Sequence, residues 1–379
     1  MKTILLVPTE IGVGLTSACL GLIYALECQG IKAGFLKPFS QELQPEADRT
    51  TALYRHLFKH ETVEPITYAA LTERLKNDEN DELLEDAVRL HREISKHHDI
   101  IIVEGVLPNG RDPFATELNA NLAKALDAKV IIVSNADINN PVKTASKVDN
   151  QLRFFGGASG ERTAGVLFMR TKGLPEDSAQ IPVTLDPSLR LISDTNQFVS
   201  KIQTTHPMIG KDCMPVIGLV PFSNTLSVPR MSDLAAHISA EWINQGEAAQ
   251  RRVLHSSLIA SNIEHEMHKF VAGELIISGS DRVDVLLASS LASSNGIPLA
   301  GLVLTEQKAP SAQALEFCQA AIKNGLPILH TKLSTFETAQ QLLNLSNEIP
   351  VDDTERAEQV TRFVASHINQ EWLSHLISD

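Results

Sequence analysis

The chain has 379 residues, 43% of them hydrophobic and 21% charged, a composition that supports a packed core and excludes disorder as its main state. Its 33 Lys and Arg are outnumbered by 46 Asp and Glu, and the formal net charge of −13 gives no electrostatic footprint for nucleic acid or an anionic membrane. At about 150 residues per domain, this length predicts two or three domains.

The cysteines and the hydropathy pattern favour a cytoplasmic protein. The four cysteines are too scattered for a disulfide scaffold or a CxxC metal knuckle. They are Cys19, Cys28, Cys213 and Cys318. No segment reaches about 18 uninterrupted apolar residues, so we expect a cytoplasmic protein with reduced thiols and no membrane partner.

Short apolar runs alternate with helical patterns in the first 170 residues. The runs are apolar on both faces, as expected for parallel strands that are covered on both sides. They occur at residues 4–7, 34–36, 100–103, 130–133 and 165–169, with helical patterns at 15–29, 81–96, 115–126 and 141–155. This order predicts an open α/β sheet with helices on both faces. A polar stretch over 171–212 reads as loop or insertion before a further strand at 215–220.

A second α/β unit is predicted after a break near residues 246–252, which follows a helix expected at 231–244. Its strands are expected at 254–260, 274–278, 299–304 and 328–331, and its helices at 281–294, 311–323 and 335–345. An acidic stretch then opens a final helix. The predicted domains are therefore 1–246, 251–350 and a C-terminal helix within 351–379.

The first strand leads through a glycine-containing turn directly into a helix, the geometry that binds phosphate at a helix N-terminus. Thr9, Gly12, Gly14 and Thr16 hold loop positions, but Leu15 stands where a working P-loop needs Lys. Loss of that cation removes the main stabiliser of a transferring phosphoryl group. Two readings stay open: a degenerate anion site, or glycines that only let the helix pack tightly on the strand.

Two other strand ends belong to the same edge of the predicted sheet. Lys37 closes the second strand and could reach a phosphate held by the loop. Glu104 ends a strand of the Walker-B type and could hold Mg²⁺ through water, together with Thr16. The alternative for both side chains is an ordinary solvated charge at a strand end.

These three features together resemble the dethiobiotin synthetase-like branch of P-loop proteins. The sequences Val7-Pro8-Thr9 and Phe35-Leu36-Lys37-Pro38, and the loop with its Leu15, are more similar still to the N-terminal domain of long, multidomain bacterial phosphate acetyltransferases. In that family Leu is usual at the loop position of Lys. One departure is Met169-Arg170, where the relatives tend to carry Asn-Lys, because Met cannot make the hydrogen bonds of a base-reading Asn.

The second unit is similar to the DRTGG domain that follows in those enzymes. Asp281 and Arg282 match its Asp-Arg pair, and Thr305 matches its Thr, but Glu306-Gln307 stand in place of Gly-Gly. Asp281, Arg282 and Thr305 are thus effector-site candidates. Asp281 could instead cap a helix, with Arg282 left for an anion.

The resemblance implies an N-terminal regulatory and oligomerisation region whose catalytic acetyltransferase domain lies outside this chain. It also implies a homo-oligomer and an effector such as NADH, pyruvate or phosphoenolpyruvate. No catalytic residue is predicted in this chain, and no cofactor beyond a nucleotide with Mg²⁺ or NADH as effector. Two alternatives remain: an ATP-dependent ligase of the dethiobiotin synthetase type using Thr16, Lys37 and Glu104, and a scaffold that binds no small molecule.

Overall fold

The structure is a computed structural model of the chain. It forms two compact units, residues Met1–Ser223 with Ile349–Asp379, and residues Asn224–Glu348. The residues it describes are 1–43, 47–108, 114–173, 196–204, 206–211, 214–306, 308–345 and 348–378.

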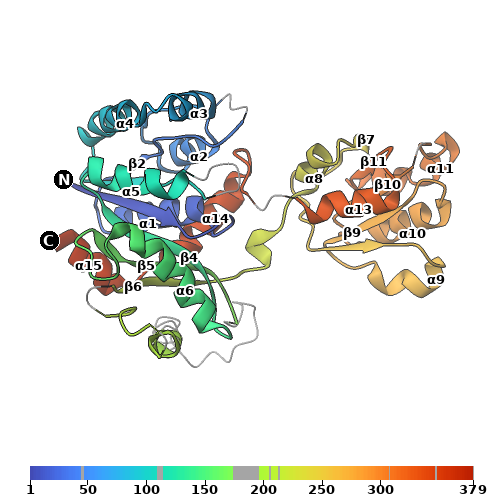
Figure 1. Ribbon diagram of the computed structural model, residues 1–379. Helices are drawn as coiled ribbons and strands as arrows, with labels where there is room; N and C mark the ends of the chain where they lie inside the picture. Colours follow the sequence, from blue (N-terminus) through green and yellow to red (C-terminus); the bar gives the residue numbers. More distant parts are fainter. Residues whose placement is uncertain are drawn as a thin grey trace. The chain divides into compact units, whose positions relative to one another are not determined.

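A six-stranded sheet forms the centre of the first unit, and all its paired strands run parallel (Figure 1). The strand order is β2-β3-β1-β4-β5-β6. The strands are β1 (Lys2–Pro8), β2 (Ala33–Leu36), β3 (Ile100–Glu104), β4 (Lys129–Asp137), β5 (Thr163–Lys172) and β6 (Val216–Pro221). Each contains one of the apolar runs expected from the sequence, so the predicted parallel sheet is confirmed.

Helices cover both faces of this sheet, and two hydrophobic clusters mark the two faces. One face packs against α3 (Tyr68–Lys76), α4 (Asn80–Ser95), α5 (Ala115–Ala125) and α6 (Pro141–Leu152). The other packs against α1 (Leu15–Cys28), α2 (Arg49–Phe58), α14 (Thr354–Ser366) and α15 (Gln370–Ser378). A 3₁₀ turn, η1 (Arg153–Phe155), follows α6, and a helix spans 196–203 within the stretch expected to be loop or insertion. Residues 174–195 of that stretch lie outside the described residues.

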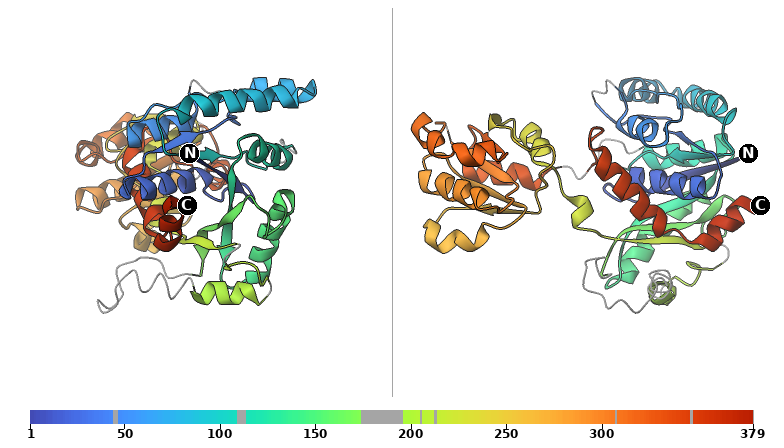
Figure 2. Two further views of the ribbon diagram at one scale, coloured as in Figure 1. Left: turned by 90° about the vertical axis from the view of Figure 1, so that its left-hand side faces the viewer. Right: turned by 180° about the vertical axis from the view of Figure 1, so that it is seen from behind.

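The C-terminal segment belongs to the first unit, where sequence reasoning treated it as a separate helix. Helix α14 lies along α1 (Figure 2), and a Cβ placed on Gly21 of α1 would come within 2.4 Å of Val364. The segment is two helices, because the backbone around Ile368 pairs with β6: Ile368 bridges Gly218, and Asn369 N donates to Ile217 O at 2.7 Å.

The second unit is a five-stranded sheet in the order β7-β11-β10-β9-β8, in which only β7 runs antiparallel to its neighbour. Its strands are β7 (Glu241–Asn244), β8 (His255–Leu258), β9 (Glu274–Gly279), β10 (Gly301–Thr305) and β11 (Ile328–His330). Its helices are α8 (Met231–His237), α9 (Ile263–Glu266), α10 (Val283–Ser294), α11 (Ala312–Phe317), α12 (Gln319–Lys323) and α13 (Thr335–Leu343), with 3₁₀ turns η2 (Thr225–Ser227) and η3 (Met267–Lys269). The smaller α/β domain expected from the sequence is thus present.

Three expectations for this unit need correction. The single helix expected at 231–244 is α8 followed by β7, because Ser239 takes a left-handed φ of 49° and β7 then pairs with β11. With those elements in the second sheet, the unit starts at Asn224 and not near residue 250. The expected helix 311–323 is likewise two, α11 and α12, which meet at Cys318.

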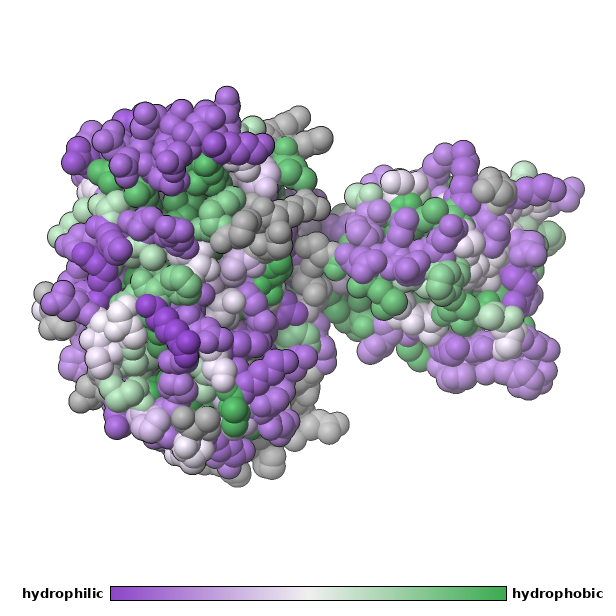
Figure 3. Space-filling view, in the orientation of Figure 1, coloured by the Kyte–Doolittle hydropathy of each residue, from purple (hydrophilic) through white to green (hydrophobic). Residues whose placement is uncertain are grey.

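Polar side chains dominate the face of each unit that Figure 3 shows, with smaller apolar areas between them. Among the described helices, none combines the length and the apolar character needed to cross a membrane.

Candidate functional site

The loop after β1 lies at the point where the strand order reverses, since β1 sits between β3 and β4. Ligands of open α/β sheets bind at such a point, outside the carboxyl ends of the strands. Gly12 and Gly14 have φ of 75° and 83°, the left-handed region that favours glycine, and Gly14 is the N-cap of α1. The N–H groups of Gly12, Val13 and Gly14 donate to no described residue. The loop therefore keeps backbone donors for an anion at the N-terminus of a 14-residue helix.

The side chains around this loop pack against or form hydrogen bonds with other residues of the protein. Leu15 is 4% exposed and part of the hydrophobic core, so the P-loop Lys position is filled by a packing residue. A Cβ on Gly14 would lie 3.5 Å from the end of the buried Met169 side chain. Thr9 Oγ1 donates to Ser134 Oγ at 3.1 Å.

The neighbouring charges on the loop side are also paired. Glu10 forms an ion pair with Lys147 of α6. The Arg170 guanidinium lies 5.2 Å from the Phe222 ring centre, an interaction that holds this cation against an aromatic face.

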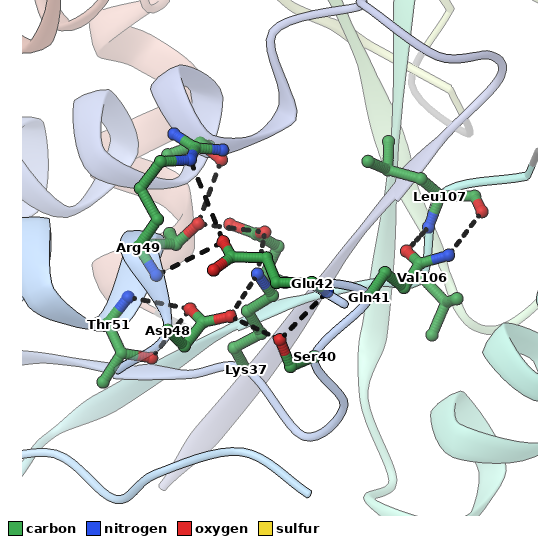
Figure 4. Close-up of polar contacts among 12 residues, drawn as sticks. Lys37, Ser40, Gln41, Glu42, Asp48, Arg49, Thr51, Val106 and Leu107 are labelled. Carbon is green, nitrogen blue, oxygen red and sulfur yellow. Dashed lines mark hydrogen bonds and ion pairs between the residues drawn. The ribbon is translucent and has the colours of Figure 1, made fainter. Parts of the chain in front are cut away.

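Lys37 is buried between two carboxylates at the same sheet edge. Its Nζ lies 2.7 Å from Asp48 Oδ2 and 3.7 Å from Glu104 Oε1. Asp48 is the N-cap of α2, and it also accepts hydrogen bonds from Ser40 Oγ, Thr51 N and Thr51 Oγ1 (Figure 4). The side chain predicted to reach a bound phosphate is therefore neutralised inside the protein.

A hydroxyl chain joins the loop to this ion cluster. Thr16 Oγ1 lies 3.2 Å from Thr50 Oγ1, which donates to Glu104 Oε1 at 3.4 Å. The other carboxylate oxygen, Glu104 Oε2, is buried without a hydrogen-bond partner. Thr16, Lys37 and Glu104, which come from three separate segments, thus lie together in one network, in which Lys37 and Glu104 are buried and Thr16 is half-buried.

The pKa values in the cluster follow from burial and from Lys37. Burial raises the pKa of Glu104, against the smaller lowering effect of Lys37. Burial would also raise the pKa of Asp48, but Lys37 and the hydrogen bonds from Lys37, Thr51 and Ser40 outweigh it and hold that pKa below its usual range. Burial acts to lower the pKa of Lys37, but the two carboxylates raise it, so the ammonium stays charged.

A magnesium ion at Thr16 and Glu104 does not fit this arrangement. The oxygen atoms of Thr16, Asp48 and Glu104 are of the type that Mg²⁺ prefers, and Glu104 Oε2 has no partner. However, the Lys37 ammonium already stands beside both carboxylates, where a cation would bind. Within the described residues no group of three or more His, Cys, Asp or Glu side chains could hold a metal ion.

The candidate residues of the second unit lie at the carboxyl ends of the neighbouring strands β9 and β10, where Thr305 pairs with Gly279 and Ser280 N donates to Thr305 O at 3.0 Å. Arg282 donates to Asp284 from Nε and Nη2, at 2.9 and 2.8 Å, and to Ser261 O at 2.9 Å. It also takes the N-cap position of α10 expected for Asp281, and no side chain caps that helix. Thr305 is fully buried and bonds to Ser278 O and Thr335 Oγ1.

Asp48 and Thr50 are the residues of the first site that sequence reasoning missed. Both lie at the start of α2, a helix absent from the prediction although Leu53, Tyr54 and Phe58 show helical spacing after an Asp N-cap. That signal could have found the helix. It could not have shown that Asp48 faces Lys37, because this contact depends on the path of the intervening chain.

The sequence matches the family described as AAA domain over residues 2–230 and the DRTGG domain over residues 233–345. Among solved structures, the MinD cell division protein of Aquifex aeolicus covers 60% of this chain and 84% of its own, with 14% identity and a TM-score of 0.34.

Curated relatives match nearly the whole chain. The phosphate acetyltransferase of Acinetobacter baylyi is 65% identical over 378 residues, which are 100% of this chain and 52% of that protein. The phosphate acetyltransferase of Pseudomonas aeruginosa is 36% identical over 377 residues, or 98% and 52%. This chain thus spans about half the length of these relatives. It belongs to the AAA domain family, in its P-loop, dethiobiotin synthetase-like branch, joined to a DRTGG domain as in the N-terminal region of phosphate acetyltransferases.

Proposed function

We propose that this chain is a regulatory and oligomerisation region of a phosphate acetyltransferase. In this proposal it senses small metabolites, while another region converts acetyl-CoA and phosphate to acetyl phosphate and coenzyme A. The observation that carries it is the ion cluster: Lys37 is paired with Asp48 and Glu104, and Leu15 is packed in the core. A phosphate-binding scaffold whose cations are committed elsewhere has kept its fold and lost its means of phosphoryl transfer.

The proposal includes three finer points. The effector is NADH, pyruvate or phosphoenolpyruvate, as the resemblance to regulated phosphate acetyltransferases implies. The chain forms a homo-oligomer. It works in the cytoplasm, where acetyl-CoA is used, in agreement with the free thiols of Cys19, Cys28 and Cys318.

A chimera tests the proposed role directly. The corresponding half of the Acinetobacter baylyi enzyme is replaced by this chain, which is 65% identical to it. We expect the chimera to be active and to respond to an effector, and this chain alone to transfer no acetyl groups. Acetyl transfer by the isolated chain, or effector responses and oligomer size unchanged when this region is deleted from the chimera, would contradict the proposal.

The gathering of Thr16, Lys37 and Glu104 at the switch point supports a second candidate, an ATP-dependent ligase. This candidate predicts ATP turnover that Lys37→Ala and Thr16→Val both abolish. Two variants are needed because the loss of Lys37 also disturbs a buried ion pair. Absence of turnover by the native chain, or turnover unchanged in both variants, would eliminate it.

A further inference from the structure

The five-stranded sheet of the second unit ends on one side at β8, which has a single neighbour, β9, among the strands of the described chain. The hydrogen bonds to β9 show which residues of β8 point toward the sheet. His255 N donates to Gly273 O at 3.3 Å, and Ile259 N, just after the strand, donates to Ile277 O at 2.9 Å. The odd-numbered residues of this segment therefore bond inward.

The main-chain groups of Ser256 and Leu258 point the other way, because successive residues of a strand turn their N–H and C=O groups to opposite sides. Both residues are exposed, Leu258 to 39%. Before the strand, Val253 N donates to Pro229 O, so the open part of the edge begins after this residue. The edge of β8 thus presents two donors and two acceptors to a further strand.

The other sheet edges of the described chain are covered or charged. Tyr54 and Thr62 donate to backbone carbonyls of β2, at 3.1 and 2.6 Å. The backbone around Ile368 pairs with β6. The strand β7 carries the exposed Glu241. Proteins protect free edges by cover, charge or proline, and β8, with the sequence His-Ser-Ser-Leu, has none of these.

The charge of the chain favours a second copy as the partner of this edge. Two copies of net charge −13 repel one another, so a contact between them needs an uncharged surface. Residues 253–263 contain no Asp, Glu, Lys or Arg. In a two-fold arrangement a residue on the axis faces its own copy, where like charges would destabilise the pair. Ser257, at the middle of the open edge, is small and uncharged.

We propose that β8 pairs antiparallel with β8 of a second copy of this chain, across a two-fold axis at Ser257. Ser256 then lies opposite Leu258 of the second copy, and the outward groups of these residues form four main-chain hydrogen bonds. The two five-stranded sheets become one continuous sheet. The inference rests on the proposed homo-oligomer and gives it an interface.

Sedimentation velocity of the whole chain over a range of concentrations tests the interface. Ser256→Pro removes an outward N–H and leaves the bonds to β9 intact, a position at which edge strands accept proline. Leu258→Lys adds the charge that natural edges use against pairing. The matched control is Leu291→Lys on α10, where the Leu is 63% exposed and lies away from the edge.

We expect the native chain and Leu291→Lys to form dimers with the same dissociation constant. Ser256→Pro should raise this constant about tenfold or more, because the two-fold axis makes it lose two of the four hydrogen bonds. Leu258→Lys should also weaken the dimer. Circular dichroism of each variant confirms that the fold is kept.

A cysteine cross-link tests the register, in a chain whose exposed Cys28 is replaced by Ser. Residues at the axis form a non-hydrogen-bonded pair with Cα atoms about 4.5 Å apart, within disulfide range. Ser257→Cys should therefore give a covalent dimer when an oxidant is added. His255→Cys, on the same face of the strand, would lie opposite Ile259 of the second copy and should give little.

The outcomes separate the interface from the proposed function. Dimers of unchanged affinity in both β8 variants, or equal cross-linking of Ser257→Cys and His255→Cys, would overturn the interface and leave the homo-oligomer standing. A native chain that is monomeric at every concentration would overturn both, and is the result expected if a strand of another protein occupies this edge. Effector responses of the chimera test the regulatory role independently.

Discussion

Each unit has a sheet edge formed by the carboxyl ends of parallel strands. The two edges differ in whether their side chains are buried and paired or line an open cavity. In the first unit Lys37, Asp48 and Glu104 neutralise one another in a buried cluster, and Leu15 fills the position of the phosphate-binding Lys. In the second unit His330 and Lys332 line an open cavity. A ligand edge of this fold can thus become part of the protein core in one domain, while an open cavity lies at the corresponding edge of the other. Fold alone does not tell which of the two has kept a ligand.

The largest effect should come from breaking the ion cluster of the first unit. Lys37→Met leaves Asp48 and Glu104 buried without their cation, and we expect a loss of about 3–5 kcal/mol in the free energy of unfolding. Urea denaturation measures this loss. Lys124→Met, at an exposed site in α5, is the control and should change stability by less than about 0.5 kcal/mol. If the two variants are equally stable, the cluster does not hold this edge together.

The next largest effect should come from the contact between α1 and the C-terminal segment. Gly21→Leu places a side chain where Val364 already lies, and overpacking of this kind costs about 1–3 kcal/mol. The double variant with Val364→Ala should recover part of the loss, because it makes room. Thermal unfolding measures both. Equal losses with and without Val364→Ala would mean that α14 does not pack on α1.

The pH dependence of stability separates the two carboxylates of the cluster. A carboxyl whose pKa is raised on folding makes the folded protein less stable as the pH rises through its unfolded-state value, which for Glu104 is about 4.5. Glu104→Gln removes this effect, so the variant should gain stability relative to the native chain above about pH 4.5, by at most about 1.4 kcal/mol per pH unit.

Asp48→Asn should show the opposite trend, because the pKa of Asp48 is lowered on folding. The stability that Asp48 contributes is present above its unfolded-state value of about 3.8 and is lost as the pH falls through its folded-state value. Denaturation curves between pH 3 and 7 test both variants. Parallel curves for the native chain and Glu104→Gln would show that Glu104 is not perturbed by burial.

A smaller effect is expected at the second edge, from backbone strain. Glu306→Gly relieves a left-handed φ of 83° and should stabilise the chain by about 0.5–1 kcal/mol, the strain of about 1–2 kcal/mol less the entropy cost of Gly. Glu316→Gly within α11 is the matched control of opposite sign, since Gly in a helix costs about 1 kcal/mol. Destabilisation by both changes would show that Glu306 is not strained.

The sequence predicted elements that depend on local pattern. The apolar runs at β1, β3 and β4 are buried on both faces, so they could be recognised without knowledge of the fold. The glycines of the first loop have left-handed backbone, and their spacing between the first strand and the following helix predicts this loop. The edge at which Thr16, Lys37 and Glu104 meet followed from the rule for parallel strands.

What could not be predicted depends on contacts between distant residues. The final helix breaks at Ile368 because Gly218 and Ile217 pair with it from β6. The local pattern over 231–244 predicts helix and not β7, because the partner strand β11 follows more than 80 residues later. The charge of Lys37 was expected to face a ligand, and only the fold brings Asp48 to it.

Calorimetric titration of the chain with Mg-ATP, together with an ATP turnover assay, tests the central claim most directly. With Lys37 committed to Asp48 and Glu104, we expect no saturable binding and no turnover. Saturable binding of one ATP per chain, with turnover that Lys37→Ala and Thr16→Val abolish, would contradict the account. That result would mean that the cluster opens to receive a nucleotide and that the first unit is still an enzyme.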